Sequence, residues 1–186
     1  ADGSLPLPGE VTTADEDWNI CRAYTTIDNV TSGTENTACI DNLLESFDVG
    51  PRDLTASNEE LHVAVYADAV MVAGAEFWFN VWTTSADNFI KVFTPVTSNE
   101  VGVSQRHDGA LGGSGAKMNL PGSSTVNLRA DHLTVEGLVF ESQIDTGYGG
   151  TVLQVEGDEV TVSHNILKYS ACSVCGSGGA PAGILD

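Results

Sequence analysis

Four residues have side chains suited to acid–base chemistry: Arg106, His107, Asp108 and Arg129. The first three are consecutive in a Gly- and Ser-rich stretch, and loops on rigid scaffolds often carry functional sites. Adjacent residues of an extended chain point to opposite sides, so three in a row rarely converge on one substrate. The triplet is therefore interpreted as structural, with acid–base work as the alternative.

Four cysteines offer a second kind of chemistry. Cys21 and Cys39 flank a polar loop, whereas Cys172 and Cys175 are separated by two residues. The sequence begins without methionine, which fits signal processing or an arbitrary boundary. In an oxidising compartment, proximity predicts the disulfides Cys21–Cys39 and Cys172–Cys175. The alternative for the second pair is half of a metal site, although zinc needs further ligands and none lies nearby in sequence.

A repeat organises the second half of the chain. Segments 126–140 and 153–167 align with an offset of 27 residues, and weaker copies surround Ile90 and Leu61. Apolar and polar residues alternate within each run, as in a strand with one buried face. Such a repeat predicts an all-β parallel solenoid, whose coils stack and bury one another's apolar side chains. A β-sandwich is the alternative.

Two irregularities interrupt this repeat. The long step from Ile90 to Leu133 predicts an insertion over residues 96–124, which is expected to project as a loop. At the later turn the offset grows to 28, which places Lys168 on the inward position of Phe140. A local β-bulge is expected there, which would turn the side chains of Leu167 and Tyr169 towards the core.

The runs that begin at Leu61, Trp82, Arg106 and Leu133 read LHVAV, WTTSADNFIKVFTP, RHDG and LTVEGL. Together they resemble right-handed parallel β-helix domains of the pectate-lyase-like superfold, found in secreted and surface proteins known mainly from environmental genomes. The resemblance extends over residues 18–186 and implies a short solenoid of about four coils. In similar sequences, a run such as RHDG belongs to a framework turn. The superfold hosts lyases, hydrolases, adhesins and fibre proteins, so the resemblance does not fix an activity.

Residues 1–17 are expected to form an extended amino-terminal arm, because two prolines exclude a helix. The arm is either loose or docked on another chain through its apolar side chains Leu5, Leu7 and Val11. Residues 18–58 are expected to form a helical cap. It contains a short helical or turn segment around Ile27 and Val30, and an amphipathic helix over residues 41–47 that covers the first coil. Residues 59–186 then form the β-helix.

The charge balance is strongly acidic, with 7 Lys and Arg against 26 Asp and Glu and a net charge of −19. Nucleic-acid binding is disfavoured because little could neutralise a phosphate backbone. No apolar run is long enough to predict a membrane span. Such acidity suits a salty or calcium-bearing extracellular medium. Asp131, Asp158 and Glu159 fall at stacked corners of the repeat, where calcium could bridge them; solvated surface acids are the alternative.

The end of the sequence starts another coil that includes Ile184 and Leu185. Its exposed strand edges could be covered by further chain or by another subunit, and head-to-tail contacts between subunits make a filament. The predicted function is therefore an extracellular structural subunit that assembles with copies of itself. A polysaccharide lyase or hydrolase is the alternative, although the basic residues of the repeat (Lys91, Arg129 and Lys168) adjoin no clear acid cluster. A sugar-binding adhesin would use Trp78, Trp82 and Tyr148.

Overall fold

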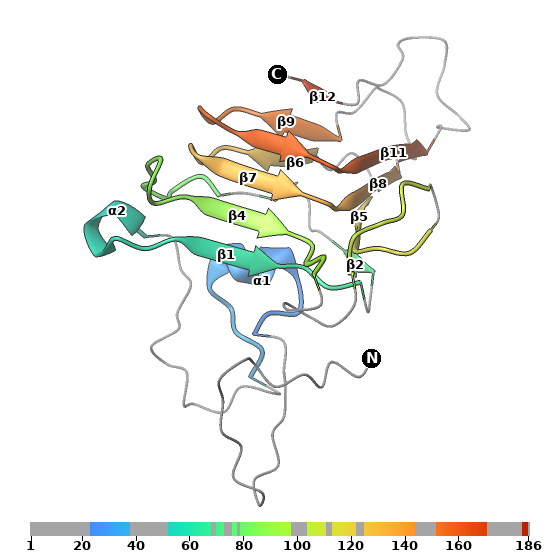
Figure 1. The fold of residues 1–186 in the computed structure, drawn as a ribbon, viewed down its shortest axis with the longest axis horizontal. Helices are drawn as coiled ribbons and strands as arrows, with labels where there is room; N and C mark the ends of the chain where they lie inside the picture. The colour runs from blue at the N-terminus through green and yellow to red at the C-terminus, as the bar shows by residue number, and fades with distance from the viewer. Residues whose placement is uncertain are drawn as a thin grey trace, which may run out of the picture.

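The computed structural model describes residues 23–37, 52–67, 70–72, 76–77, 79–97, 104–110, 113–121, 125–143, 152–170 and 184–185. Within these ranges the chain forms short helices and three sheets, and all the paired strands are parallel (Figure 1). The described chain is therefore mostly β. The β-sandwich alternative is wrong, because a sandwich is built from antiparallel sheets.

Every third strand along the chain belongs to the same sheet. The first sheet contains β1 (Leu61–Ala64), β4 (Ile90–Phe93), β7 (Leu133–Glu136) and β10 (Thr161–Ser163). The second contains β2 (Met71–Val72), β5 (Lys117–Pro121), β8 (Val139–Gln143) and β11 (Ile166–Ser170). The third contains β3 (Glu76–Phe77), β6 (Thr125–Leu128), β9 (Leu153–Val155) and β12 (Ile184–Leu185).

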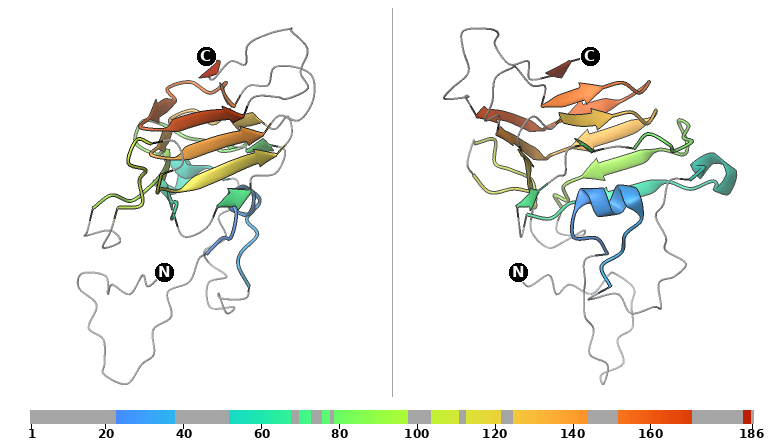
Figure 2. Two further views of the ribbon diagram at one scale, coloured as in Figure 1. Left: turned by 90° about the vertical axis from the view of Figure 1, so that its right-hand side faces the viewer. Right: turned by 180° about the vertical axis from the view of Figure 1, so that it is seen from behind.

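Three consecutive strands, one from each sheet, form what we call a pass. The first pass is β1–β3 and the fourth is β10–β12, and the passes lie in layers one above another (Figures 1 and 2). The predicted register between passes is confirmed: Leu61 lies opposite Ile90, and Ile90 lies opposite Leu133. The alternation of burial along β4 and β7 follows from the two-residue period of a strand.

The predicted extra residue at the last turn is wrong. Leu167 lies opposite Phe140, and Lys168 lies opposite Glu141 at a separation of 27 residues, so the offset is unchanged and no bulge is needed. The corners after β7 and β10 have equal length because Gly137 and His164 both adopt positive φ, +84° and +53°. The second of these corners is held by a side chain that bonds to the backbone of the pass below.

That side chain belongs to Asn165. Its Nδ2 donates to the carbonyl oxygen of Val135, and its Oδ1 accepts from the backbone N–H of Leu138, each at 2.8 Å. One amide thus satisfies two backbone groups at a corner where the sheet ladder is interrupted. This bonding fixes the turn and explains why the register does not slip.

The segment 96–124, expected to project as an insertion, contains β5. Met118 and Leu120 on this strand are buried, and β5 pairs with both β2 and β8. The alternation of Ala116, Met118 and Leu120 is a strand signal within the Gly-rich composition. Residues 117–121 therefore belong to the second sheet and do not project as a loop.

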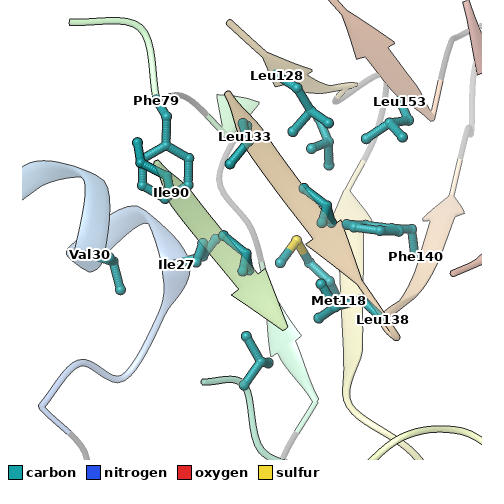
Figure 3. Packing of buried hydrophobic residues seen from close by; sticks show 14 of the residues in the cluster. Ile27, Val30, Phe79, Ile90, Met118, Leu128, Leu133, Leu138, Phe140 and Leu153 are labelled. Carbon is teal, nitrogen blue, oxygen red and sulfur yellow. The ribbon is translucent and has the colours of Figure 1, made fainter. Parts of the chain in front are cut away.

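The core lies between the three sheets, and Leu133, Phe140 and Met118 belong to one buried apolar cluster there (Figure 3). Helix α1 (Ile27–Ser32) lies at the β1 end of the layers, and its Ile27 and Val30 join the same apolar cluster (Figures 1 and 2). This helix matches the short segment expected around these two residues. Its first turn is capped by the Thr26 hydroxyl.

Helix α2 (Leu54–Ser57) is capped by Asp53, whose carboxylate accepts from the backbone N–H groups of Thr55 and Ala56. The hydrogen bond from the Thr55 hydroxyl, followed by that from the Ala56 backbone, holds the pKa of Asp53 below its ordinary value. No helix in the described part of the chain is long and apolar enough to cross a membrane. The arm over residues 1–17, the expected helix over 41–47 and all four cysteines lie outside the described residues.

Candidate functional site

Residues 104–110, which we call the strap, run along the corner where the first sheet turns into the second. Gln105 ties the strap to the lower layers: its Oε1 accepts from the backbone N–H of Ala67, after β1, at 3.0 Å. The Gln105 backbone N–H donates to the carbonyl oxygen of Pro95, after β4, at 2.8 Å. Gln105 therefore contacts the first and second passes.

The next two residues of the strap reach the upper layers. Nη2 of Arg106 donates to Oε1 of Glu136, at the end of β7. Nε2 of His107 bonds to the carbonyl oxygen of His164, after β10. Because a carbonyl oxygen only accepts, this Nε2 carries a proton. The strap is thus bonded to all four passes, so the Arg106 region is bound along the layers where the sequence predicted a projecting loop.

Glu136 is the electrostatic centre of this corner. Its side chain is 22 % exposed, with Lys91 Nζ at 3.5 Å from Oε2 and His164 Nδ1 at 3.8 Å from Oε1, in addition to the Arg106 bond. Burial raises the pKa of Glu136, but the hydrogen bond and charge of Arg106, with the charge of Lys91, outweigh it and hold the pKa below its ordinary value. Glu136 is therefore an ionised carboxylate whose charge is balanced by Arg106 and Lys91.

The strap fits closely because Gly137 has no side chain. A Cβ there would lie 2.0 Å from Thr94 Oγ1 and 2.8 Å from Arg106 Nε. Thr94 in turn donates to the carbonyl oxygen of Gly137 at 3.2 Å. The guanidinium packs against this corner, and its buried Nε has no hydrogen-bond partner within the described residues. The corner accepts Arg106 only in a narrow geometry.

The three consecutive candidates of the strap have different partners. Arg106 bonds to Glu136 and His107 bonds to the His164 carbonyl, whereas Asp108 Oδ1 accepts from the backbone N–H of Ala110 at 3.0 Å. Their side chains do not meet on one point, as the alternating directions of an extended chain imply. As a group they fasten the fold and do not form an acid–base pair.

Arg129, the fourth candidate, follows β6 and pairs with Glu156, with 2.6 Å between Nε and Oε2. Lys168 Nζ lies 3.0 Å from Oε1 of Glu141. The sequence analysis finds no clear acid cluster beside the basic residues of the repeat, and in the structure Arg129 and Lys168 are each paired with a glutamate. The signal was present: these partners are 27 residues apart, which is the offset of the repeat.

The candidate metal ligands Asp131, Asp158 and Glu159 bind protein groups in the structure. Asp131 Oδ1 accepts from the backbone N–H of Asp158 at 2.8 Å, and Glu159 Oε2 lies 2.9 Å from Nδ1 of His132. Across the described ranges, no group of three or more His, Cys, Asp or Glu side chains is placed to hold a metal ion. Asp131 instead links the corner of the third pass to that of the fourth.

Of the three aromatic candidates for sugar stacking, one lies in the core and two lie outside the described residues. Trp82 is buried and makes an edge contact with Phe79, with 6.1 Å between ring centroids. Trp78 and Tyr148 lie outside the described residues. The sequence missed a different set on the first sheet, where the exposed ring of His62 lies 5.6 Å from Phe89 and 6.3 Å from Phe93.

The predicted subunit contacts are only partly described. Ile184 and Leu185 form β12, which pairs in parallel with β9. Leu5, Leu7 and Val11 lie outside the described residues.

Comparison of the chain with protein-family models, with curated proteins and with solved structures finds no match.

Proposed function

We propose that this chain is a right-handed parallel β-helix that serves as an extracellular structural subunit and assembles head-to-tail with copies of itself. The supporting observation is a difference in burial between the inner and outer passes. Val135 and Phe140, in the third pass, are fully buried, whereas Val162 and Leu167, opposite them in the fourth, are only half-buried.

The other end of the first sheet has the same property. Leu61 and Val63 on β1 are half-buried, whereas Ile90 and Val92 opposite them on β4 are fully buried. All strands of the sheet are parallel, so a second copy placed head-to-tail would continue the same pairing and cover both apolar edges. Helix α1 contacts β3 at this end, where it would act as a partial cap.

Charge acts against such assembly. With a net charge of −19, two copies repel each other at low ionic strength. Dissolved salt screens this repulsion, and divalent calcium could bridge surface carboxylates of adjacent subunits. The proposed subunit is therefore suited to a saline or calcium-containing extracellular setting, where association would be strongest.

Sedimentation velocity and electron microscopy of the purified chain test this proposal. The sedimentation coefficient should rise with protein concentration, more steeply in salt or calcium, and micrographs should show linear particles. Val162→Glu, at the fourth-pass edge, should reduce association, whereas Thr134→Glu adds the same charge on β7 and should reduce it less. Monomers at every concentration in all these media would refute the assembly proposal.

The alternative as a polysaccharide lyase or hydrolase has less support. A lyase base must accept a proton, but the guanidinium groups of Arg106 and Arg129 have no acceptor lone pair and are each paired with a glutamate. The His62, Phe89 and Phe93 rings favour a non-catalytic sugar-binding role over catalysis, because aromatic faces stack on sugar rings. Titration with a neutral glucan oligosaccharide, comparing the wild type with Phe93→Ala, would test this second candidate.

A further inference from the structure

We propose that Asp108 and Gly109 form a self-modification site, at which the strap converts an aspartate into a succinimide and then into isoaspartate with His107 as the base. Three groups carry the inference: the Asp108 carboxyl, the backbone nitrogen of Gly109 and the His107 ring. They belong to consecutive residues on an exposed part of the strap. This chemistry is independent of the proposed assembly.

The His107 ring is oriented for the proton transfer. Its Nε2–H is bonded to the carbonyl oxygen of His164. The backbone N–H of Gly109 donates to Nδ1 at 3.2 Å, so the lone pair of the ring lies on Nδ1 and faces the Gly109 nitrogen. A base that already accepts a hydrogen bond from the attacking nitrogen is placed to remove its proton. The bond to His164 holds the ring in this tautomer, much as a third group orients the base of a nucleophilic site.

The electrophile is held beside the same peptide. Asp108 Oδ1 accepts from the Ala110 backbone N–H at 3.0 Å, which fixes the carboxyl group over the peptide that follows it. Gly109 offers no side chain that would hinder attack, and a Cβ there would meet no residue beyond its chain neighbours within 4 Å. A Cβ on Gly113 would lie 2.4 Å from Asp108 Oδ1, so Gly113 leaves the room that the carboxyl group occupies.

The chemistry balances without an external oxidant or reductant. The Gly109 nitrogen attacks Cγ of the protonated Asp108 carboxyl, and its proton passes to His107 Nδ1. A C–N bond forms, the C–OH bond breaks, and the proton returned by His107 lets the hydroxyl depart as water. Solvent water then opens the succinimide at either carbonyl. One opening restores aspartate, and the other leaves an isoaspartyl linkage with one additional methylene in the backbone.

The experiment follows the purified full chain during incubation at neutral pH. Trypsin cuts after Arg106 and Lys117, and Asp108 is the only acidic residue of the resulting peptide 107–117. Succinimide is detected as the loss of one water by mass spectrometry, and isoaspartate by isoaspartyl methyltransferase. Native chain should convert at least about tenfold faster than chain held in denaturant, as a positioned base implies. Asp2 and Gly3, the other Asp–Gly pair, follow no histidine and report the ordinary rate.

His107→Gln keeps a donor for the His164 carbonyl but removes the base, so its native rate should fall to that of the denatured chain. Thr134→Gln, which changes a residue of β7 outside the strap, should leave the rate unchanged. A native rate equal to or below the denatured rate would overturn the proposal, even if His107→Gln failed to fold. So would an undiminished rate in a folded His107→Gln chain.

Discussion

The third and fourth passes have matching positions but different surroundings. Val135 and Val162 lie opposite each other in the first sheet, yet the third-pass side chain is fully buried and the fourth-pass side chain is half-buried. The same holds for Phe140 and Leu167 in the second sheet. Among the described residues, burial therefore follows whether described strands pair with a layer on both sides, and the residue type decides only whether that burial is favourable.

The largest expected effect comes from a matched pair of truncations. Val135→Ala should lower the free energy of unfolding by about 2 kcal/mol, because it removes two buried methyl groups and leaves a cavity. Val162→Ala removes the same atoms from a half-buried site and should cost less than about 1 kcal/mol. Urea unfolding of both variants measures the difference. Equal losses would mean that the fourth pass is as well covered as the third.

A double-mutant cycle compares ion pairs on the inner passes. Combining Arg106→Met with Glu136→Gln should give a coupling energy of about 1 kcal/mol, since both side chains are 22 % exposed. The pair Arg129 and Glu156, 37 % and 33 % exposed, should give about 0.3 kcal/mol in a parallel cycle with Met and Gln. Chemical denaturation of the seven proteins (the wild type, four single variants and two double variants) supplies both values. If Arg106 holds the strap on the layers, the coupling energy between Arg106 and Glu136 must be larger than that between Arg129 and Glu156.

The low pKa of Glu136 makes its contribution to stability depend on pH. Its folded pKa lies below the ordinary value, so the stabilisation is fully present above about pH 4.5 and is lost as the pH falls through the folded pKa. The stability difference between wild type and Glu136→Gln should therefore be constant near neutrality and shrink in acid. Denaturation midpoints measured from neutral to acidic pH would show this. A difference that grows in acid would have the wrong sign.

Salt should have the smallest effect on the comparison between passes. Sodium chloride screens repulsion across the whole acidic chain, so it should stabilise the wild type, Val135→Ala and Val162→Ala by similar amounts. The gap between the two valine variants should change by less than about 0.3 kcal/mol, as expected for independent contributions. A large salt-dependent change in that gap, measured well below any concentration of association, would show that charge controls how the fourth pass packs.

Much of the layered arrangement could be predicted from the sequence. The alternation around Leu133 and the offset between repeats place Ile90, Leu133 and Val162 in their observed registers, because a strand has a two-residue side-chain period and a slip would expose the apolar set. The same offset would have predicted the Glu141–Lys168 pair. The prediction of a bulge was wrong because it aligned Ile166 with Leu138, whereas Ile166 lies opposite Val139. The error falls next to a corner whose length depends on the φ angle of His164.

The sequence by itself determined which residues alternate, which strands can stack and how acidic the surface is, because these properties are local or repeat at a fixed interval. Only the tertiary structure decided the path of the strap. Gln105, Arg106 and His107 reach partners 38, 30 and 57 residues away, and none of these separations is the repeat offset. The path of an irregular loop depends on which unsatisfied groups the folded layers present at their corner, and no periodic pattern encodes that.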